Sequence, residues 1–281
     1  MKILEKLMTS RPSSILPLLG FSTAVFMAPM STNAQVLANF ADGNSTRAVD
    51  GYVGTAGNGW NSAWGSTTFS SGSFAATEVR SNNPLTAGQN RLAVNFRNPN
   101  ASGHAGGALH RALDSNFGVL NADQPRTVQF EFRLDSPITA TTQSFVDMFE
   151  QGSVNSGVRD NARWLIRIMG SNRGNAVANE FAFYDGGKDG ATFDYDNFVS
   201  SGITVQQGQI YTIAVHSDPV TQSYSVSNDD GNSVISFSDL GWWGNMTTNG
   251  NILNFGAVVN FESDVDYSIG SISVIPELHL F

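Results

Sequence analysis

The stretch between Arg163 and Phe198 constrains the fold most, because apolar and polar residues alternate along it. Residues 164–169 and 180–184 are two such runs, separated by a turn rich in Gly and Asn. Apolar side chains at every second residue are typical of β-strands with one buried face and one wet face. This stretch therefore predicts two strands joined by a turn.

The same alternation recurs along the chain, most clearly at 127–134, where Val128, Phe130, Phe132 and Leu134 share one face. Further strands are expected at 36–40, 91–97, 106–113, 144–149, 208–216, 223–228, 233–237, 252–261 and 267–275. For residues 106–113 the alternative is a short helical turn over 110–113. Residues 229–232 (Asp-Asp-Gly-Asn) are typical of a hairpin turn, since these residues tolerate positive φ. About a dozen strands without a convincing amphipathic helix predict an all-β fold, a single antiparallel β-sandwich over residues 35–275.

Composition narrows the classes of partner and cofactor. The chain has 281 residues, a formal charge of −9 and no cysteine. Without cysteine, disulfides, zinc–thiolate sites, iron–sulfur clusters and cysteine nucleophiles are excluded. An acidic chain without a basic patch argues against nucleic acid and anionic lipid as partners.

Residues 1–34 have the features of a secretory signal peptide. Three basic residues lead it: Lys2, Lys6 and Arg11. An apolar run over 15–28 follows, and small residues at 32–34 precede a cleavage expected before Gln35. The apolar run is shorter than the roughly 20 residues of a spanning helix. We therefore expect export, an extracellular or cell-surface location and no stable membrane anchor in this chain, the alternative being a buried N-terminal helix.

The pattern resembles a known kind of protein. Many strands, a Gly/Trp-rich opening and a long central meander are similar to the concanavalin A-like jelly roll of lectins and laminin-G-like domains. The last strand runs into Pro276 and Glu277, which resembles exported bacterial PEP-CTERM proteins, where a Val-Pro-Glu-Pro-like motif precedes an apolar helix and an Arg-rich end. Here residues 278–281 replace the second Pro, and neither helix nor basic end follows. The resemblance implies that 276–281 are the remnant of a truncated sorting motif.

Four tryptophans are candidates for binding sugar rings. Trp60 and Trp64 lie four residues apart among glycines, and Trp242 and Trp243 are adjacent. Aromatic faces suit the apolar faces of sugars, so these residues could bind an extracellular polysaccharide. The alternative is that Trp60 and Trp64 pin a long loop to the sandwich, and that one of the adjacent pair belongs to the core.

One loop could hold a metal ion, with calcium as the expected cation. Calcium takes six to eight oxygen ligands, and jelly-roll lectins often carry it in such loops. The candidate ligands are Asp185, Asp189, Asp194, Asp196 and Asn197. Their spacing does not match an EF-hand, and Gly/Asp loops are also good turns. Separately, His104 and His110 could bind zinc with a carboxylate, although their spacing is unremarkable.

The enzymatic alternatives are weaker, and the sequence assigns no catalytic residue. Glycoside hydrolysis needs two carboxylates acting together, but Asp147 and Glu150 are three residues apart, which predicts opposite faces of a strand. A lyase could use Arg133, Arg167, Tyr211 and His216, of which the last two also fall on opposite faces. The leading hypothesis is a non-catalytic glycan-binding or matrix-related protein. A polysaccharide hydrolase or lyase and a purely structural envelope component remain the alternatives.

Overall fold

The computed structural model describes residues 36–40, 47–48, 52, 59–114, 124–152, 162–186, 196–243 and 251–277. The expected signal peptide, residues 1–34, lies outside the described residues, and so do residues 278–281 of the expected sorting remnant. Within the described ranges, no helix has the length and apolar character needed to span a membrane.

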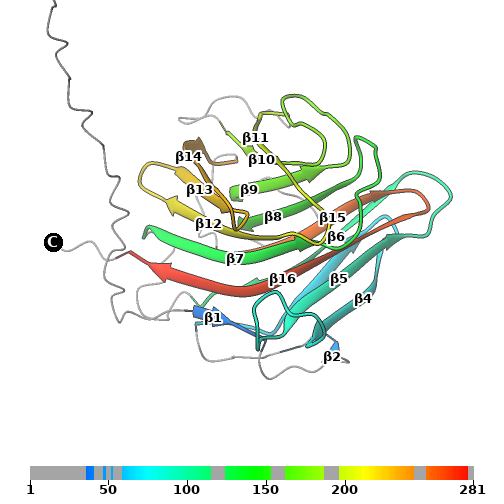
Figure 1. Ribbon diagram of the computed structural model, residues 1–281, viewed down its shortest axis with the longest axis horizontal. Helices are drawn as coiled ribbons and strands as arrows, with labels where there is room; N and C mark the ends of the chain where they lie inside the picture. Colours follow the sequence, from blue (N-terminus) through cyan, green and yellow to red (C-terminus); the bar gives the residue numbers. More distant parts are fainter. Residues whose placement is uncertain are drawn as a thin grey trace, which may run out of the picture. The chain divides into compact units, whose positions relative to one another are not determined.

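The described residues form two antiparallel sheets (Figure 1). The nine-stranded sheet has the order β14-β13-β12-β7-β16-β5-β4-β2, with β1 paired to β16 beside β5. Its strands are β1 (Val36–Ala38), β2 (Arg47–Ala48), β4 (Ser73–Arg80), β5 (Arg91–Asn98), β7 (Arg126–Leu134), β12 (Ile210–Asp218), β13 (Ser223–Asp229), β14 (Val234–Gly241) and β16 (Ser263–Pro276).

The seven-stranded sheet has the order β11-β10-β9-β8-β15-β6-β3. Its strands are β3 (Gly65–Phe69), β6 (His104–Ala112), β8 (Phe145–Gln151), β9 (Ala162–Met169), β10 (Glu180–Tyr184), β11 (Phe198–Thr204) and β15 (Ile252–Asn260). The expected single antiparallel β-sandwich of jelly-roll type is therefore confirmed.

The described chain has sixteen strands rather than about a dozen. Four were not expected: β2, β3, β4 and β11. Strands β2, β3 and β11 each form an edge of their sheet, and β4 is second from an edge. Such strands bury little apolar surface, so Ser, Thr and Gly suffice there and the alternation is weak.

The core lies between the sheets and follows the predicted alternation. Phe130 and Phe132 of β7 are fully buried, and Phe130 packs edge-on against Phe255 of β15 with ring centroids 5.3 Å apart. The hydroxyl of Tyr267 on β16 donates to the carbonyl of Phe255 across the sandwich at 3.0 Å. The two sheets are thus joined by ring packing and by a buried hydrogen bond.

The expectation of one wet face is wrong for the central strands of the seven-stranded sheet. Every residue of β8 and β9 is buried, because a second apolar cluster covers the outer face of this sheet. Its largest members are Phe145, Phe149, Leu165, Met169, Tyr184, Phe198 and Trp243. Alternation still decides which side a residue faces, but both sides are covered.

Candidate functional site

The four tryptophans belong to the interior. Their exposed fractions are 5% for Trp60, 1% for Trp64, 5% for Trp242 and 1% for Trp243. A sugar-stacking platform needs an exposed ring face, so the structure corrects that prediction. The indole nitrogen of Trp60 donates to the carbonyl of Leu37 at 3.2 Å, and its ring packs on Trp64 at 6.3 Å. These contacts agree with the alternative, in which the pair pins its segment to the sandwich.

The candidate calcium loop is described only in part, because Asp189 and Asp194 lie outside the described residues. Asp185 accepts a hydrogen bond from the backbone of Gly241 at 2.9 Å, and Asp196 pairs with Arg173 at 2.7 Å. Asn197 donates to the Asp185 carbonyl. The described part of the chain contains no group of three acidic or His side chains able to hold a metal, so calcium binding stays a prediction.

The first part of this loop connects the two sheets through a backbone hydrogen bond. Gly186 donates its N–H to the carbonyl of Gly241 at 3.0 Å. A Cβ at Gly186 would lie 1.8 Å from the backbone oxygen of Trp242. Glycine is therefore required by the close approach of two backbones, which is a structural reason for its place in the loop.

The two carboxylates of β8 face opposite sides, as their spacing predicts. Asp147 points to the outer face, where Arg167 binds it with two hydrogen bonds of 2.7 and 3.0 Å. Glu150 points into the sandwich, where it pairs with Arg126 and accepts from the Trp164 indole at 2.9 Å. Both carboxylates are buried and ion-paired, and they cannot flank one substrate.

The hypothetical lyase residues are likewise not brought together. Arg167 lies in the seven-stranded sheet, whereas Arg133, Tyr211 and His216 lie in the nine-stranded sheet. Tyr211 is 1% exposed and packs in the core against Phe181. Burial raises the pKa of Tyr211, which disfavours its use as a base.

The outer face of the seven-stranded sheet, which we call the front face, carries two neighbouring hollows that share Phe69 and Val258. Strand pairing places Phe69, Gly106, Val258 and Phe145 in one row across β3, β6, β15 and β8. The next row contains Ala108, Gly256 and Asp147. Because Gly and Ala have little or no side chain, the floor is low between taller aromatic walls.

The glycine at position 106 sets the place of one wall. A Cβ at Gly106 would lie 2.2 Å from the ring of Phe69 and 2.9 Å from Val258. The Phe69 ring therefore lies directly over the backbone of the neighbouring strand. It meets the His104 ring edge-on at a centroid distance of 6.2 Å.

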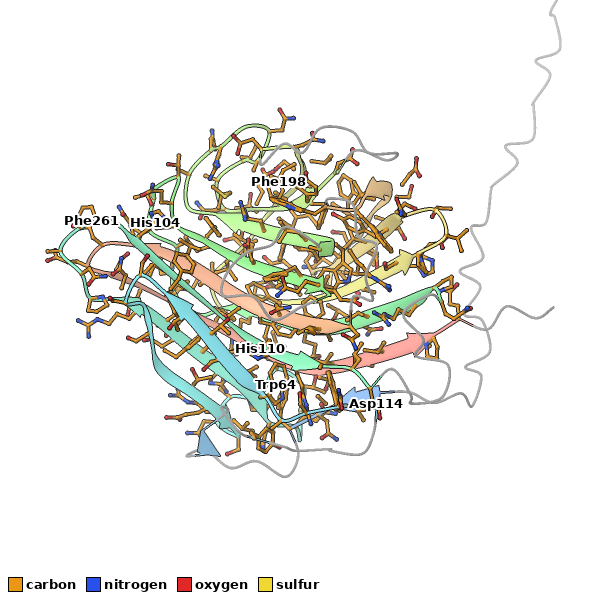
Figure 2. All side chains as sticks on the ribbon, turned by 180° about the vertical axis from the view of Figure 1, so that it is seen from behind. Trp64, His104, His110, Asp114, Phe198 and Phe261 are labelled. Atoms are coloured by element: carbon orange, nitrogen blue, oxygen red, sulfur yellow. The ribbon has the colours of Figure 1, made fainter. Side chains whose placement is uncertain are left out.

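The larger of the two hollows is a cavity of about 230 Å³, which we call the front pocket. Its lining residues are Phe69, His104, Gln143, Phe145, Arg173 and Val258. Figure 2 shows His104 at one end of the sandwich, with Asp114 toward the other. The pocket combines two aromatic rings with an imidazole, an amide and a guanidinium, so it can offer apolar contact and hydrogen bonds together.

A buried ion pair supports the aromatic side of the pocket. The Arg167 guanidinium lies 4.0 Å from the centroid of Phe145 and 5.0 Å from that of Phe198. Asp147 holds the same guanidinium from below and also lines a small cavity, of about 10 Å³, beside the pocket.

Burial raises the pKa of Tyr267 in the core, and the charge of Asp147 raises it further.

Sequence reasoning missed most of this site. Only His104 was singled out, and then as a zinc candidate. The available signal was the run Gly106-Gly107-Ala108 inside a strand, since glycine within a strand marks a close approach of backbone or ligand. No local pattern connects that run to Phe69, Gln143 or Arg173.

No family model and no curated protein matches the chain. Among solved structures, it is similar to winged bean acidic lectin complexed with methyl-alpha-D-galactose, with 13% identity over 77% of this chain and 99% of that one and a TM-score of 0.45. A carbohydrate esterase from Shiga toxin-encoding bacteriophage phi24B matches with 15% identity over 76% and 90%, TM-score 0.45. A sialidase matches with 9% identity over 66% of this chain but 15% of its own, TM-score 0.39. These likenesses are remote, so the ligand has to be argued from the residues of this chain.

Proposed function

We propose that the chain is an exported, non-catalytic glycan-binding protein whose ligand occupies the front pocket. The observation that carries this proposal is the pairing of two phenylalanine rings with three hydrogen-bonding side chains around one cavity. A sugar has apolar ring faces and polar hydroxyl edges, and this lining matches both. Export is proposed from the signal-peptide features of residues 1–34.

The arrangement of the polar groups favours binding over hydrolysis. A hydrolase needs two carboxylates about 5–9.5 Å apart, one on each side of the scissile bond. Among the described residues that line the front pocket and the small cavity beside it, Asp147 is the single carboxylate. Its two oxygens already accept from Arg167. Recognition without bond cleavage is the simpler use of these groups.

The proposal is tested by titrating the purified protein with a panel of neutral and acidic oligosaccharides, with calcium and with chelator. Phe69→Ala removes one half-buried wall of the pocket, and His104→Ala removes one polar edge. Each should weaken binding about tenfold, as expected for loss of about 1.4 kcal/mol. Phe261→Ala is the matched control, because Phe261 is 47% exposed and does not line the pocket.

The outcomes separate the alternatives. Loss of affinity in Phe69→Ala but not in Phe261→Ala supports the front pocket. Shortening of a bound polysaccharide would overturn the non-catalytic role. Calcium dependence of binding would point to the loop that contains Asp185 and Asp196. If no oligosaccharide binds, the structural envelope role replaces this proposal.

A further inference from the structure

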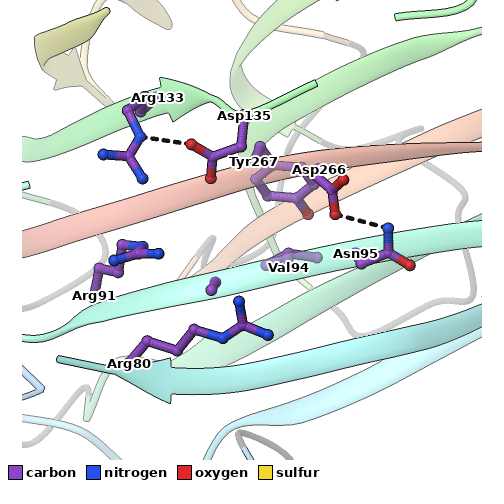
Figure 3. A pocket seen from close by; sticks show the side chains of 9 residues that line it. Arg80, Arg91, Val94, Asn95, Arg133, Asp135, Asp266 and Tyr267 are labelled. Atoms are coloured by element: carbon purple, nitrogen blue, oxygen red, sulfur yellow. Dashed lines mark hydrogen bonds and ion pairs between the residues drawn. The ribbon is translucent and has the colours of Figure 1, made fainter. Parts of the chain in front are cut away.

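The outer face of the nine-stranded sheet, which we call the back face, carries a second and larger pocket (Figure 3). This back pocket has a volume of about 340 Å³, at the lower end of the range of about 300–1,000 Å³ for small-molecule sites. Its polar lining consists of Arg80, Arg91, Asn95, Arg133, Asp135 and Asp266. The residues come from β4, β5, β7 and β16 and from the residue that follows β7.

The pocket forms because Ala93, which has a small side chain, is surrounded by residues with long side chains. Ala93 on β5 lies between Glu78 of β4 and Ser268 of β16, and Ser268 in turn faces Arg133 of β7. Longer side chains rise around this low point from the same and neighbouring rows. The floor belongs to a continuous sheet, so the site is rigid.

Three guanidinium groups converge on one side of the pocket. Arg91 and Arg133 are only 7% and 6% exposed, whereas Arg80 is more open. Burial lowers the pKa of Arg91; the charge of Arg133 lowers it further, Asp135 opposes this, and Arg80 adds to the lowering. Glu78 pairs with Arg80 and Asp135 with Arg133, whereas the described bonds of Arg91 go to a hydroxyl and a backbone carbonyl. An anion that joins the three groups would therefore mainly compensate the charge of Arg91.

The protein holds these arginines mainly through their Nε atoms. Arg133 donates from Nε to Asp135 at 2.5 Å. Arg91 donates from Nε to the hydroxyl of Ser268 at 3.2 Å, and from Nη1 to the carbonyl of Asn83 at 2.5 Å. In the part of the chain that the structure describes, the Nη atoms of Arg133 have no hydrogen-bond partner, and Figure 3 shows one of them on the side of Arg91.

The opposite side of the pocket carries acceptors. Asp266 accepts from the amide of Asn95 at 2.7 Å, and Figure 3 shows these two residues across from Arg91. Asp135 contributes a second carboxylate beside Arg133. The lining thus holds three positive and two negative groups. The three guanidinium groups form what we call the donor wall; Asp266 lies across from Arg91, whereas Asp135 lies next to Arg133.

We propose that the back pocket binds a sugar residue that carries a carboxylate, such as a uronic acid unit of a polysaccharide. The carboxylate meets the donor wall, because guanidinium groups bind carboxylates with strong, paired hydrogen bonds. The sugar hydroxyls donate to Asp266 and Asp135, and Asn95 completes the polar edge. A compact multiply charged anion such as sulfate fits less well, since the two aspartates repel it and receive no hydroxyl in return.

This site is independent of the front pocket, because the two lie on different sheets and share no lining residue. The decisive experiment is calorimetric titration of the purified full chain with oligogalacturonate, with the matched neutral galactose oligomer, and with sodium sulfate and sodium acetate. Oligogalacturonate should bind, and the neutral oligomer should bind at least tenfold more weakly. Binding should also weaken as salt rises, since the arginine contacts are ionic.

Matched variants locate the binding. Arg80→Gln should weaken oligogalacturonate binding about tenfold, whereas Arg97→Gln, the same change on an exposed residue of β5 outside the pocket, should not. Ala93→Leu fills the floor without altering charge and should abolish binding. Thermal melting of each variant shows that it is folded.

Several outcomes would overturn the assignment. Equal affinity for the neutral oligomer, or equal loss in Arg80→Gln and Arg97→Gln, excludes specific recognition of the carboxylate here. Sulfate or acetate binding as tightly as the oligomer means that the pocket takes a simple anion rather than a sugar. Phe69→Ala is expected to leave this titration unchanged; if it abolishes the binding, the acidic glycan occupies the front pocket instead.

Discussion

The front and back faces of the sandwich each carry an arginine–aspartate pair, but in opposite surroundings. On the front face, Arg167 and Asp147 are both 2% exposed and lie beneath aromatic rings. On the back face, Arg133 is also largely buried, yet Asp135 is 25% exposed and borders an open pocket. The same two residue types therefore serve as a buried support in one sheet and as ligand-accessible groups in the other.

The difference shows that the side chains packed over the outer face of a sheet, rather than the strand itself, decide whether a charged residue is accessible to a ligand. Both faces are outer faces of antiparallel sheets that share one core. The front face is covered by an apolar cluster, so the ion pair between Arg167 and Asp147 is shielded from water. Each of the two charges therefore depends on its partner in the protein. The back face has no such cluster among the described residues, so its arginines can exchange protein contacts for a ligand.

The largest expected effect comes from breaking the front pair. Arg167→Met removes the guanidinium that neutralises the buried Asp147 carboxylate and should lower the free energy of unfolding by about 3–5 kcal/mol. The matched change on the back face, Arg133→Met, should lower it by about 1 kcal/mol or less, because water can reach Asp135. Urea unfolding of both variants measures the contrast.

A double variant sharpens the same comparison. Asp147→Leu combined with Arg167→Met removes both charges and should recover most of the stability lost in Arg167→Met alone. Equal losses of unfolding free energy in Arg167→Met and Arg133→Met would contradict the explanation that burial makes the front pair the more costly one to break.

A variant with an intermediate effect on stability is expected to affect the front face alone. Gly106→Ala places a methyl group where the Phe69 ring now lies, which forces the ring away and should lower the free energy of unfolding by about 1–3 kcal/mol. Oligosaccharide binding at the front pocket should weaken with it, and oligogalacturonate binding at the back pocket should not. Ser66→Ala, on an exposed residue of β3, is the control.

The smallest expected effect lies outside both faces, in the turn between β13 and β14. The Asp230 carboxylate accepts from the N–H groups of Asn232 and Ser233, each at 2.8 Å, and these bonds hold the pKa of Asp230 below its usual range. Its stabilising contribution is therefore present above about pH 4, the pKa of an unfolded aspartate, and is lost as pH falls through the lower folded value.

Asp230→Ala should accordingly cause a small loss of stability at pH 7 that fades below pH 4, while both ligand titrations stay unchanged. Urea midpoints of the variant and the parent protein at pH 7, 5 and 3 give the comparison. A difference that grows toward pH 3 would contradict the assigned role of this carboxylate.

Elements with a strong local pattern could be predicted from the sequence. The alternation over 127–134 predicted β7 and its buried face, and residues 229–232 predicted the turn between β13 and β14. The spacing of Asp147 and Glu150 predicted opposite faces, which the structure confirms. Edge strands such as β3 and β11 escaped prediction because they bury too little for a clear pattern.

The candidate sites could not be predicted in the same way. The tryptophans were chosen for their chemistry, but ring chemistry does not reveal that a ring is buried. The front pocket joins Phe69, His104, Phe145 and Arg173, and the back pocket joins Arg80, Arg91 and Arg133. Residues so far apart in the chain meet only through strand pairing.

By itself, the sequence determined the strand pattern, the all-β class and the side of the sheet toward which each residue of a regular strand points. These properties follow from the two-residue period of a strand, which is local. Only the tertiary structure decided which strands are neighbours, in which register they pair and which outer face is covered. Those depend on contacts between distant segments, because burial is a property of the whole packed sandwich and not of any one strand.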